Sequence, residues 1–208
     1  FPPQYNNYAG SMPLTYFGFD PSVTKDEVRE RLLQYKTADN RITDSAAAGT
    51  ALATGVKTNN TYLGVSPDGT AVESLFEVAQ RGGKATGVVV TTYLQHATPA
   101  AFYAHIPSRH EYAKISEQLL GSKIDVAIGG GVSFFDERYG SRAQAVEAIE
   151  AAGFTLANDF AAVERATPDS RLLALVADKE VGADSGSYLA DATRKSLELL
   201  EARGGDEG

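Results

Sequence analysis

The feature that most constrains this chain is a repeated alternation between helical segments and short runs of apolar residues, most of them followed or preceded by glycine. The short runs are rich in branched aliphatic residues and have the length of strands buried on both faces. They lie at 85–91, 124–128, 154–156 and 172–176. The alternation predicts an α/β fold built on a mainly parallel central sheet, with helices on both faces.

Helical segments separate these strands. Apolar residues recur at helical spacing over Val23–Tyr35, Arg109–Leu120, Ser141–Ala152 and Tyr188–Ala202, and most of these segments stop at a glycine. The sequence shows no internal repeat and no low-complexity linker. We therefore predict a single domain over 1–208, with an N-terminal arm and helix at 1–42 and the α/β core at 43–208.

One helix start is predicted from local chemistry. Thr70 and Glu73 have the spacing of a capping box, in which each side chain binds a backbone N–H at the start of the helix. Apolar residues within 75–79 would form the buried side of this helix, and the pair Gly82–Gly83 would end it in the left-handed conformation.

Composition excludes several classes of protein. The net charge of −8 and the pI of about 4.9 leave no basic field for nucleic acid. The absence of Cys excludes disulfides and thiolate metal sites. The apolar runs are far shorter than a membrane span, and no signal region opens the chain, which begins at Phe1. A bound anion would need local positive charge from an Arg or a metal ion.

The most informative short run is Thr43–Thr50, which reads TDSAAAGT. Ser45 follows Asp44 and precedes small residues that begin a helix, where free N–H groups favour an anion. A Ser oxygen in that position is placed to attack phosphorus while N–H groups hold the phosphoryl oxygens. The alternative is an Asp/Ser cap on an Ala-rich helix, and the local pattern alone favours the cap.

Two further groups of polar residues follow the strand at 85–91. His96 and Thr98 lie just beyond it, where parallel sheets place ligand sites, and they offer an imidazole and a hydroxyl to a metal site. The alternative is that Thr98 caps a helix with Pro99 at its first position. Arg109 offers two parallel donors for two phosphoryl oxygens, or is a solvated surface residue.

The remaining His and Gly residues are assigned structural roles. His105 and His110 have no partner at recognisable metal spacing, so we expect them to be structural or exposed. The triple glycine at 129–131 lacks a phosphate-loop pattern, and a tight turn after a strand accounts for it.

In combination, these motifs resemble the alkaline phosphatase family in order and spacing. The resemblance rests on TDSAAAGT at 43–50, TGVKT at 54–58, HATP at 96–99, Ser108–Arg109, DVAIGGG at 125–131 and TRKSLELL at 193–200. The first motif is highly specific and the others support it. The resemblance implies a three-layer α/β sandwich, incomplete in this chain, and a hydrolase that cleaves phosphate monoesters at alkaline pH.

The resemblance also implies a role for each matching residue. Ser45 would be the nucleophile that becomes phosphorylated, with its oxygen bound to zinc, and Asp44 would orient the phosphate-binding Arg109. Thr98 would be a magnesium ligand, with His96 beside that metal where other members have Asp. The complete enzyme would hold two zinc ions and one magnesium ion.

Most zinc ligands of the family have no counterpart here. Nothing in residues 1–42 matches the early metal-binding Asp motif, and the three His all lie in the middle of the chain. We therefore expect a fragment truncated at both ends, impaired in catalysis by itself and able to associate with the rest of its parent. The resemblance further implies a homodimeric parent located in the periplasm or outside the cell.

Two alternatives stay open at this point. One is a phosphodiesterase or sulfatase of the same broad superfamily, although diesterases usually place Thr at the position of Ser45 and this chain has no Cys for a Cys-type sulfatase. The other is a non-catalytic relative that holds phosphate through Ser45 and Arg109 without zinc.

Overall fold

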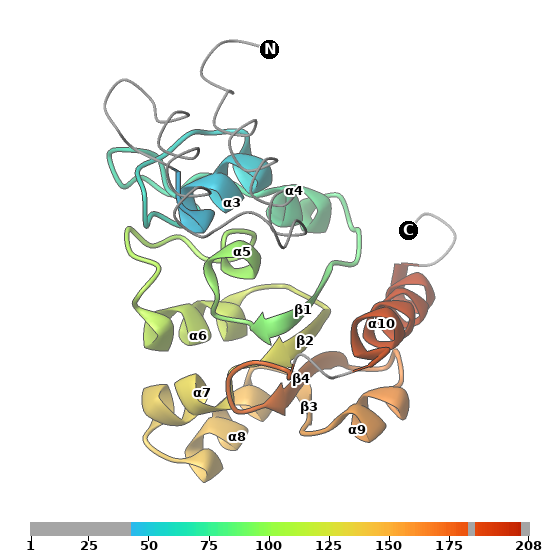
Figure 1. Cartoon of the computed structure of the whole chain (residues 1–208). Helices are drawn as coiled ribbons and strands as arrows, with labels where there is room; N and C mark the ends of the chain where they lie inside the picture. The colour runs from blue at the N-terminus through green and yellow to red at the C-terminus, as the bar shows by residue number, and fades with distance from the viewer. Residues whose placement is uncertain (1–42, 183–185, 205–208) are drawn as a thin grey trace, which may run out of the picture. The chain divides into compact units, whose positions relative to one another are not determined.

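The computed structural model describes residues 43–182 and 186–204 (Figure 1). The chain divides into two compact units, and the fold below belongs to the unit that begins at Ser45. Its sheet has four strands: β1 (Gly87–Tyr93), β2 (Val126–Gly130), β3 (Phe154–Ala157) and β4 (Arg171–Ala177). They are ordered β1-β2-β4-β3, and every neighbouring pair is parallel. The predicted α/β fold with a parallel sheet is confirmed.

The helices of the described residues alternate with these strands. They are α3 (Ser45–Thr54), α4 (Leu75–Arg81), α5 (Ala97–Ala100), α6 (Tyr112–Gly121), α7 (Val132–Tyr139), α8 (Arg142–Ala151), α9 (Phe160–Glu164) and α10 (Tyr188–Gly204). The helix predicted at Val23–Tyr35 lies outside the described residues.

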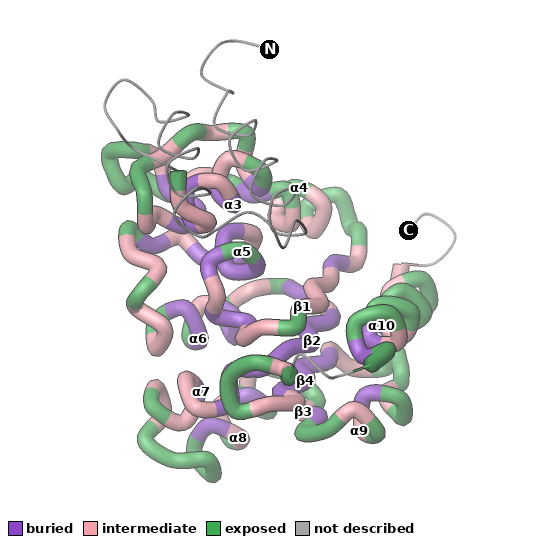
Figure 2. Tube along the Cα trace, viewed as in Figure 1, coloured by how far each residue is buried: buried purple, intermediate pink, exposed green. Residues whose placement is uncertain are grey.

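Successive residues of the central strands enter two different apolar clusters. In β2, Val126 and Ile128 pack in the cluster that contains residues of α9 and α10, whereas Ala127 packs in the cluster that contains residues of α6, α7 and α8. In β4, Leu172 and Leu173 divide between the clusters in the same way. This period of two means that both faces of the sheet are covered by helices (Figures 1 and 2).

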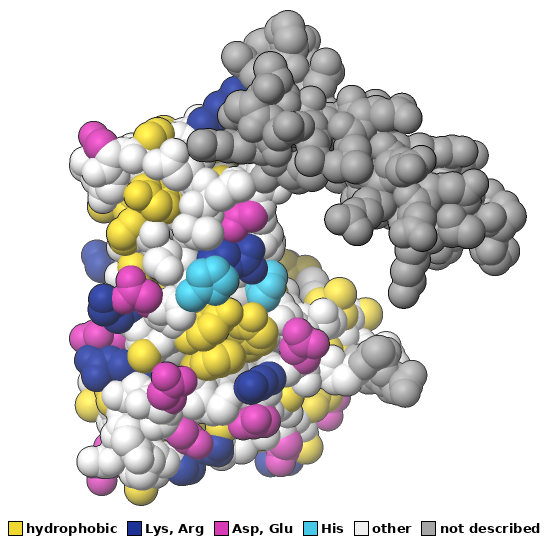
Figure 3. All heavy atoms as spheres, turned by 60° about the vertical axis from the view of Figure 1, so that its left-hand side comes forward, with side chains coloured by type: hydrophobic (Ala, Val, Ile, Leu, Met, Phe, Trp, Pro, Cys, Tyr) yellow, Lys and Arg dark blue, Asp and Glu magenta, His cyan; other side chains and the backbone are white. Residues whose placement is uncertain are grey.

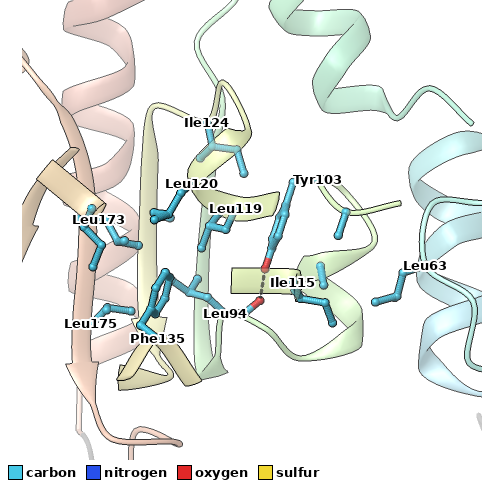
Figure 4. Close-up of a cluster of buried hydrophobic side chains, with 14 of the residues drawn as sticks. Leu63, Leu94, Tyr103, Ile115, Leu119, Leu120, Ile124, Phe135, Leu173 and Leu175 are labelled. Carbon is cyan, nitrogen blue, oxygen red and sulfur yellow. Dashed lines mark hydrogen bonds between the residues drawn. The ribbon is translucent and has the colours of Figure 1, made fainter. Parts of the chain in front are cut away.

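The larger cluster joins the sheet to the helices near the end of β1 (Figure 4). Leu94, Ile115, Leu119 and Phe135 are almost completely buried in it. Each such side chain contributes about 1.5–3 kcal/mol of burial energy. The hydroxyl of the buried Tyr103 donates a 2.7 Å hydrogen bond to the carbonyl oxygen of Leu94, so the turn after β1 is held by the core.

The predicted capping box is wrong in its position. The helix α4 begins one turn later, with Ser74 as the cap: the Ser74 hydroxyl accepts from the N–H of Glu77, and the Glu77 carboxylate accepts from the N–H of Ser74. The carbonyl of Thr70 instead accepts a hydrogen bond from the N–H of Ser66 in a turn. The predicted buried side is right for Phe76, which packs against the larger apolar cluster, and wrong for Leu75 and Val78, which are exposed. The predicted left-handed end is confirmed by Gly83, with φ of 76°.

Other differences concern helix ends and short helices. The helix predicted from Arg109 begins at Tyr112, because Ser108 and Arg109 belong to a turn that precedes it. The short helices α7 and α9 were not predicted. Among the described residues, no helix is both long and apolar enough to cross a membrane.

Candidate active site

Ser45 is the first residue of α3, whose small side chains allow close packing. Gly49 lies so near α5 that an added Cβ would be 3.0 Å from the Cβ of Ala101. The absence of a side chain at Gly49 therefore lets α3 and α5 pack closely. Ser45 lies at the N-terminal end of this helix, where the helix dipole favours negative charge.

His96 follows β1 and directly precedes α5. It occupies the cap position without a side-chain cap bond, and Thr98 is the second residue of α5 and is exposed. The alternative in which Thr98 caps the helix is therefore wrong. His96 lies beyond the carboxyl end of a parallel strand, the place where such sheets bind ligands.

Arg109 joins Ser45 and His96. Its Nη1 donates to the hydroxyl oxygen of Ser45 at 2.5 Å, and its Nη2 lies 3.3 Å from Nε2 of His96. A guanidinium has no acceptor, so Nε2 of His96 accepts this bond and the ring proton is on Nδ1. Burial and then the positive charge of Arg109 lower the pKa of His96, which agrees with a neutral ring. Three residues singled out in the sequence thus meet at one place.

The backbone of Arg109 is held as well as its side chain. Its N–H donates to the carbonyl oxygen of Thr61 at 2.7 Å. Leu63 and Ile106 exchange two further backbone bonds, at 2.9 and 2.8 Å. The two segments therefore run side by side as a short antiparallel pair that leads to Arg109.

An aromatic cluster adjoins His96. The ring of Tyr93 contacts the rings of His96, Tyr112 and Phe134, with centroids 5.2, 5.6 and 5.0 Å away. Burial and the neighbouring Tyr112 raise the pKa of Tyr93 to about 12, so its hydroxyl stays neutral in alkaline solution. Figure 3 shows His side chains beside Lys or Arg and next to a hydrophobic patch on one face.

The other two His have the roles expected from the sequence. Nδ1 of His105 lies 2.7 Å from the carbonyl oxygen of Gly64, and its Nε2 lies 3.0 Å from Oε1 of Glu77. His105 is therefore structural, and His110 is exposed. A cavity of about 560 Å³ is lined by Glu77, His105 and Lys123 among others, and it does not include Ser45, His96 or Arg109.

The candidate metal ligands Ser45, His96 and Thr98 are not joined by a cluster of acidic or His side chains among the described residues. Within residues 43–182 and 186–204, no three His, Asp or Glu side chains lie together as a metal site requires. Ser45, His96 and Thr98 by themselves offer two hydroxyls and one imidazole. These residues do not make a complete zinc or magnesium site.

Sequence reasoning missed the residues that hold this site together. Thr50, Thr61 and Tyr93 each bond or pack against a site residue or its segment. The only local signal was Thr50, which ends the TDSAAAGT motif. Tyr93 ends β1, two residues beyond the predicted strand at 85–91, and Thr61 occurs in a stretch without a recognisable pattern.

Comparison with known proteins gives consistent results. The family model described as alkaline phosphatase matches residues 24–184. Alkaline phosphatase 4 of Bacillus subtilis is 41% identical over 173 residues, a match that covers 78% of this chain and 37% of that protein. Alkaline phosphatase of Escherichia coli is 34% identical over 201 residues, covering 83% of this chain and 42% of the relative. The chain thus spans about two fifths of these relatives.

Solved structures show the same fold. The cold-active alkaline phosphatase of a psychrophilic Shewanella superposes with a TM-score of 0.73 at 33% identity, over 95% of this chain and 50% of that one. An alkaline phosphatase of the Antarctic bacterium TAB5, in a His-to-Asp variant with Mg bound in its M3 site, superposes with a TM-score of 0.72. That match has 30% identity and covers 83% of this chain and 50% of the neighbour.

Proposed function

This chain belongs to the alkaline phosphatase family, and on that premise we propose that it carries the nucleophile and the phosphate clamp of a phosphomonoesterase. The observation that carries the proposal is the 2.5 Å hydrogen bond from Arg109 to the Ser45 hydroxyl oxygen. The two residues are 64 positions apart, so only the fold brings them together.

In the proposed reaction, the Ser45 oxygen attacks the phosphorus of a phosphate monoester. A bond forms between this oxygen and phosphorus as the bond from phosphorus to the alcohol oxygen breaks. The Ser45 proton passes to base in the alkaline solution, and the departing alcohol oxygen takes a proton from water. A water molecule then hydrolyses the phosphoserine, which releases inorganic phosphate and restores the hydroxyl.

Arg109 would bind two phosphoryl oxygens through its parallel N–H groups. Because it already contacts Ser45, a phosphate held by Arg109 would lie next to the attacking oxygen. The dipole of α3 adds a partial positive charge at the N-terminal turn that carries Ser45, and this charge favours a bound anion. This local positive field would attract phosphate to a protein with a net charge of −8. Asp44, next to Ser45 in sequence, is proposed to orient Arg109, by family resemblance.

We propose metal binding because the chain belongs to this family and because a structural neighbour has Mg bound. Thr98 and His96 would contribute to a magnesium site, and Ser45 to a zinc site. The described residues do not complete either site, so no step above is assigned to a metal. For the same reason we propose that the 208-residue chain turns over slowly by itself, or not at all.

The resemblance supports the remaining proposals. The substrates are phosphate monoesters, the complete protein is a homodimer, and it acts in the periplasm or outside the cell. We also propose that this chain associates with the remainder of a longer parent protein. The second candidate function is phosphate binding without catalysis, favoured by the incomplete metal ligand set.

Hydrolysis of p-nitrophenyl phosphate tests the proposal, with zinc and magnesium supplied at alkaline pH. The variant Ser45→Ala should lose all turnover that the unmodified chain shows. Ser170→Ala is the matched control, because its hydroxyl bonds to Thr155 at the other end of the sheet. Turnover that survives Ser45→Ala would overturn the assignment of the nucleophile.

If the unmodified chain shows no turnover, calorimetry with inorganic phosphate separates the two functions. Binding that Arg109→Ala removes would support the phosphate-binding candidate. Absence of both turnover and phosphate binding would contradict both functions for this chain.

A further inference from the structure

We propose that Thr50 is a positioning residue, which sets the distance between the Ser45 hydroxyl and the Arg109 guanidinium through the segment 61–65. The inference rests on the proposed function, because it concerns the same two residues. Thr50 lies on α3, five positions after Ser45, and is completely buried.

The hydroxyl of Thr50 makes two hydrogen bonds to segment 61–65. It donates to the carbonyl oxygen of Tyr62 at 3.1 Å and accepts from the N–H of Gly64 at 2.9 Å. A Thr hydroxyl has one proton to donate. Thr50 donates this proton to Tyr62, and its oxygen accepts from Gly64 at the same time. The helix that carries Ser45 is thereby attached to this segment at two backbone groups, one on each side of Leu63.

The other side of segment 61–65 holds the residues that lead to Arg109. The carbonyl of Thr61 accepts from the N–H of Arg109, and Leu63 pairs with Ile106. Thr61 has φ of 72°, a left-handed conformation that is unfavourable for a β-branched residue. The surrounding hydrogen bonds must therefore determine its conformation.

The geometry of Gly64 shows how closely the two sides approach. A Cβ at Gly64 would be 2.2 Å from the carbonyl oxygen of Ala104 and 2.8 Å from Nδ1 of His105. The segment is thus in direct contact with residues just before Arg109, while its other side bonds to Thr50. Movement of α3 relative to this segment would change the distance between Ser45 and Arg109.

Removal of the Thr50 hydroxyl would loosen this connection. In Thr50→Val the side chain keeps its shape, but the buried N–H of Gly64 and carbonyl of Tyr62 lose their partner. Because the phosphate clamp depends on geometry, a displacement of about 1 Å is enough to weaken it strongly.

Thr54→Val is a matched control on the same helix. The Thr54 hydroxyl also makes two hydrogen bonds, to the carbonyl oxygen of Thr50 at 2.7 Å and from the N–H of Val56 at 3.1 Å. Both of its bonds stay within residues 50–56. This variant therefore removes equivalent hydrogen bonds without touching segment 61–65.

The experiment measures the affinity for inorganic phosphate by calorimetry, and the free energy of unfolding in urea, for the unmodified chain and the variants. Both Val variants should lose stability, but only Thr50→Val should weaken phosphate binding by about tenfold or more. Thr54→Val should stay within about twofold, and Thr50→Ser, which keeps the hydroxyl, within about threefold. Equal phosphate affinity of Thr50→Val and Thr54→Val would overturn the proposal.

A second readout separates this inference from the proposed function. The NMR signal of the Arg109 Nε–H, assigned by its loss in Arg109→Lys, should shift in Thr50→Val and stay in place in Thr54→Val, without any phosphate. If the unmodified chain shows neither turnover nor phosphate binding, the proposed function fails and this signal alone decides the role of Thr50. If Thr50→Val does not fold, Thr50→Cys takes its place with the same expectations, since a thiol hydrogen-bonds only weakly.

Discussion

Nε2 of His105 lies 3.0 Å from Oε1 of Glu77, a residue 28 positions earlier in the chain. The contact joins the segment that leads to Arg109 to the first turn of α4. Glu77 also completes the capping box of that helix through the N–H of Ser74. One carboxylate thus begins a helix and holds a residue near the candidate site.

Glu77→Gln should make stability less dependent on pH. Burial acts to raise the pKa of Glu77, but hydrogen bonds from Ser74 and His105 outweigh it and lower the pKa below its usual 4.5. The unfolded chain therefore takes up this proton first as pH falls, so the contribution of Glu77 is present above pH 4.5 and is lost below it.

Urea unfolding of both proteins between about pH 7 and pH 3 measures this difference. Gln keeps the capping box, so the variant removes mainly the charge. At neutral pH the unmodified chain should be more stable by about 1 kcal/mol or less, because the Glu77 side chain is 40% exposed and solvent screens the pair. A stability difference that persists undiminished at about pH 3 would contradict the role given to this carboxylate.

Gly64→Ala should destabilise the fold far more than Gly55→Ala. Both glycines have positive φ, 59° and 74°, so the left-handed conformation should cost either Ala variant about 1–2 kcal/mol of stability. Only at Gly64 would the new Cβ collide with backbone, since nothing lies within 4 Å at Gly55. We expect an additional loss of about 2 kcal/mol or more at Gly64, measured by urea unfolding. Equal losses would mean that segment 61–65 is free to move.

Tyr103→Phe should lower stability by about 1–2 kcal/mol, because the buried carbonyl of Leu94 loses its 2.7 Å hydrogen bond from the Tyr hydroxyl. Thermal unfolding measures the loss. Tyr139→Phe is the control, since its ring is only partly buried. Burial raises the pKa of Tyr103, so this bond should persist through the alkaline range. A Tyr103→Phe protein as stable as the control would contradict the role of this bond.

Secondary structure was predictable wherever local pattern and burial agree. The strand β2 lies two residues beyond its predicted start at 124, and β4 lies within one residue of its predicted bounds, because both are runs buried on two faces. The capping box was misplaced because Thr70–Glu73 and Ser74–Glu77 have the same spacing. Tertiary contacts favour the second: the Ser74 hydroxyl donates to the carbonyl of Phe102, and Glu77 binds His105. No local pattern contains those partners.

In the candidate site, too, some residues were predictable from local motifs and others depend on tertiary contacts. Ser45, His96 and Arg109 were singled out by short motifs and family resemblance, and the structure brings them together. The role of Asp44 stays a prediction. Thr50 and segment 61–65 could not be recognised, because their contribution depends on hydrogen bonds between residues 12 and 14 positions apart.

Arg109→Lys should weaken phosphate binding although it preserves the charge. Lys offers a single point charge on a flexible stem, whereas Arg presents two parallel donors that match two phosphoryl oxygens. Losing one charge-assisted hydrogen bond costs about 1.5–3 kcal/mol, which corresponds to about tenfold or more in affinity. Calorimetry with inorganic phosphate checks the change, and Arg138→Lys on α7, where the Arg binds Glu117 at an exposed position, is the control. Because Arg109 also donates to Ser45, the same variant should lower any turnover at saturating substrate, not only the affinity. Phosphate affinity that is unchanged in Arg109→Lys would show that charge alone binds the anion, and the paired geometry of Arg109 would then have no part in recognition.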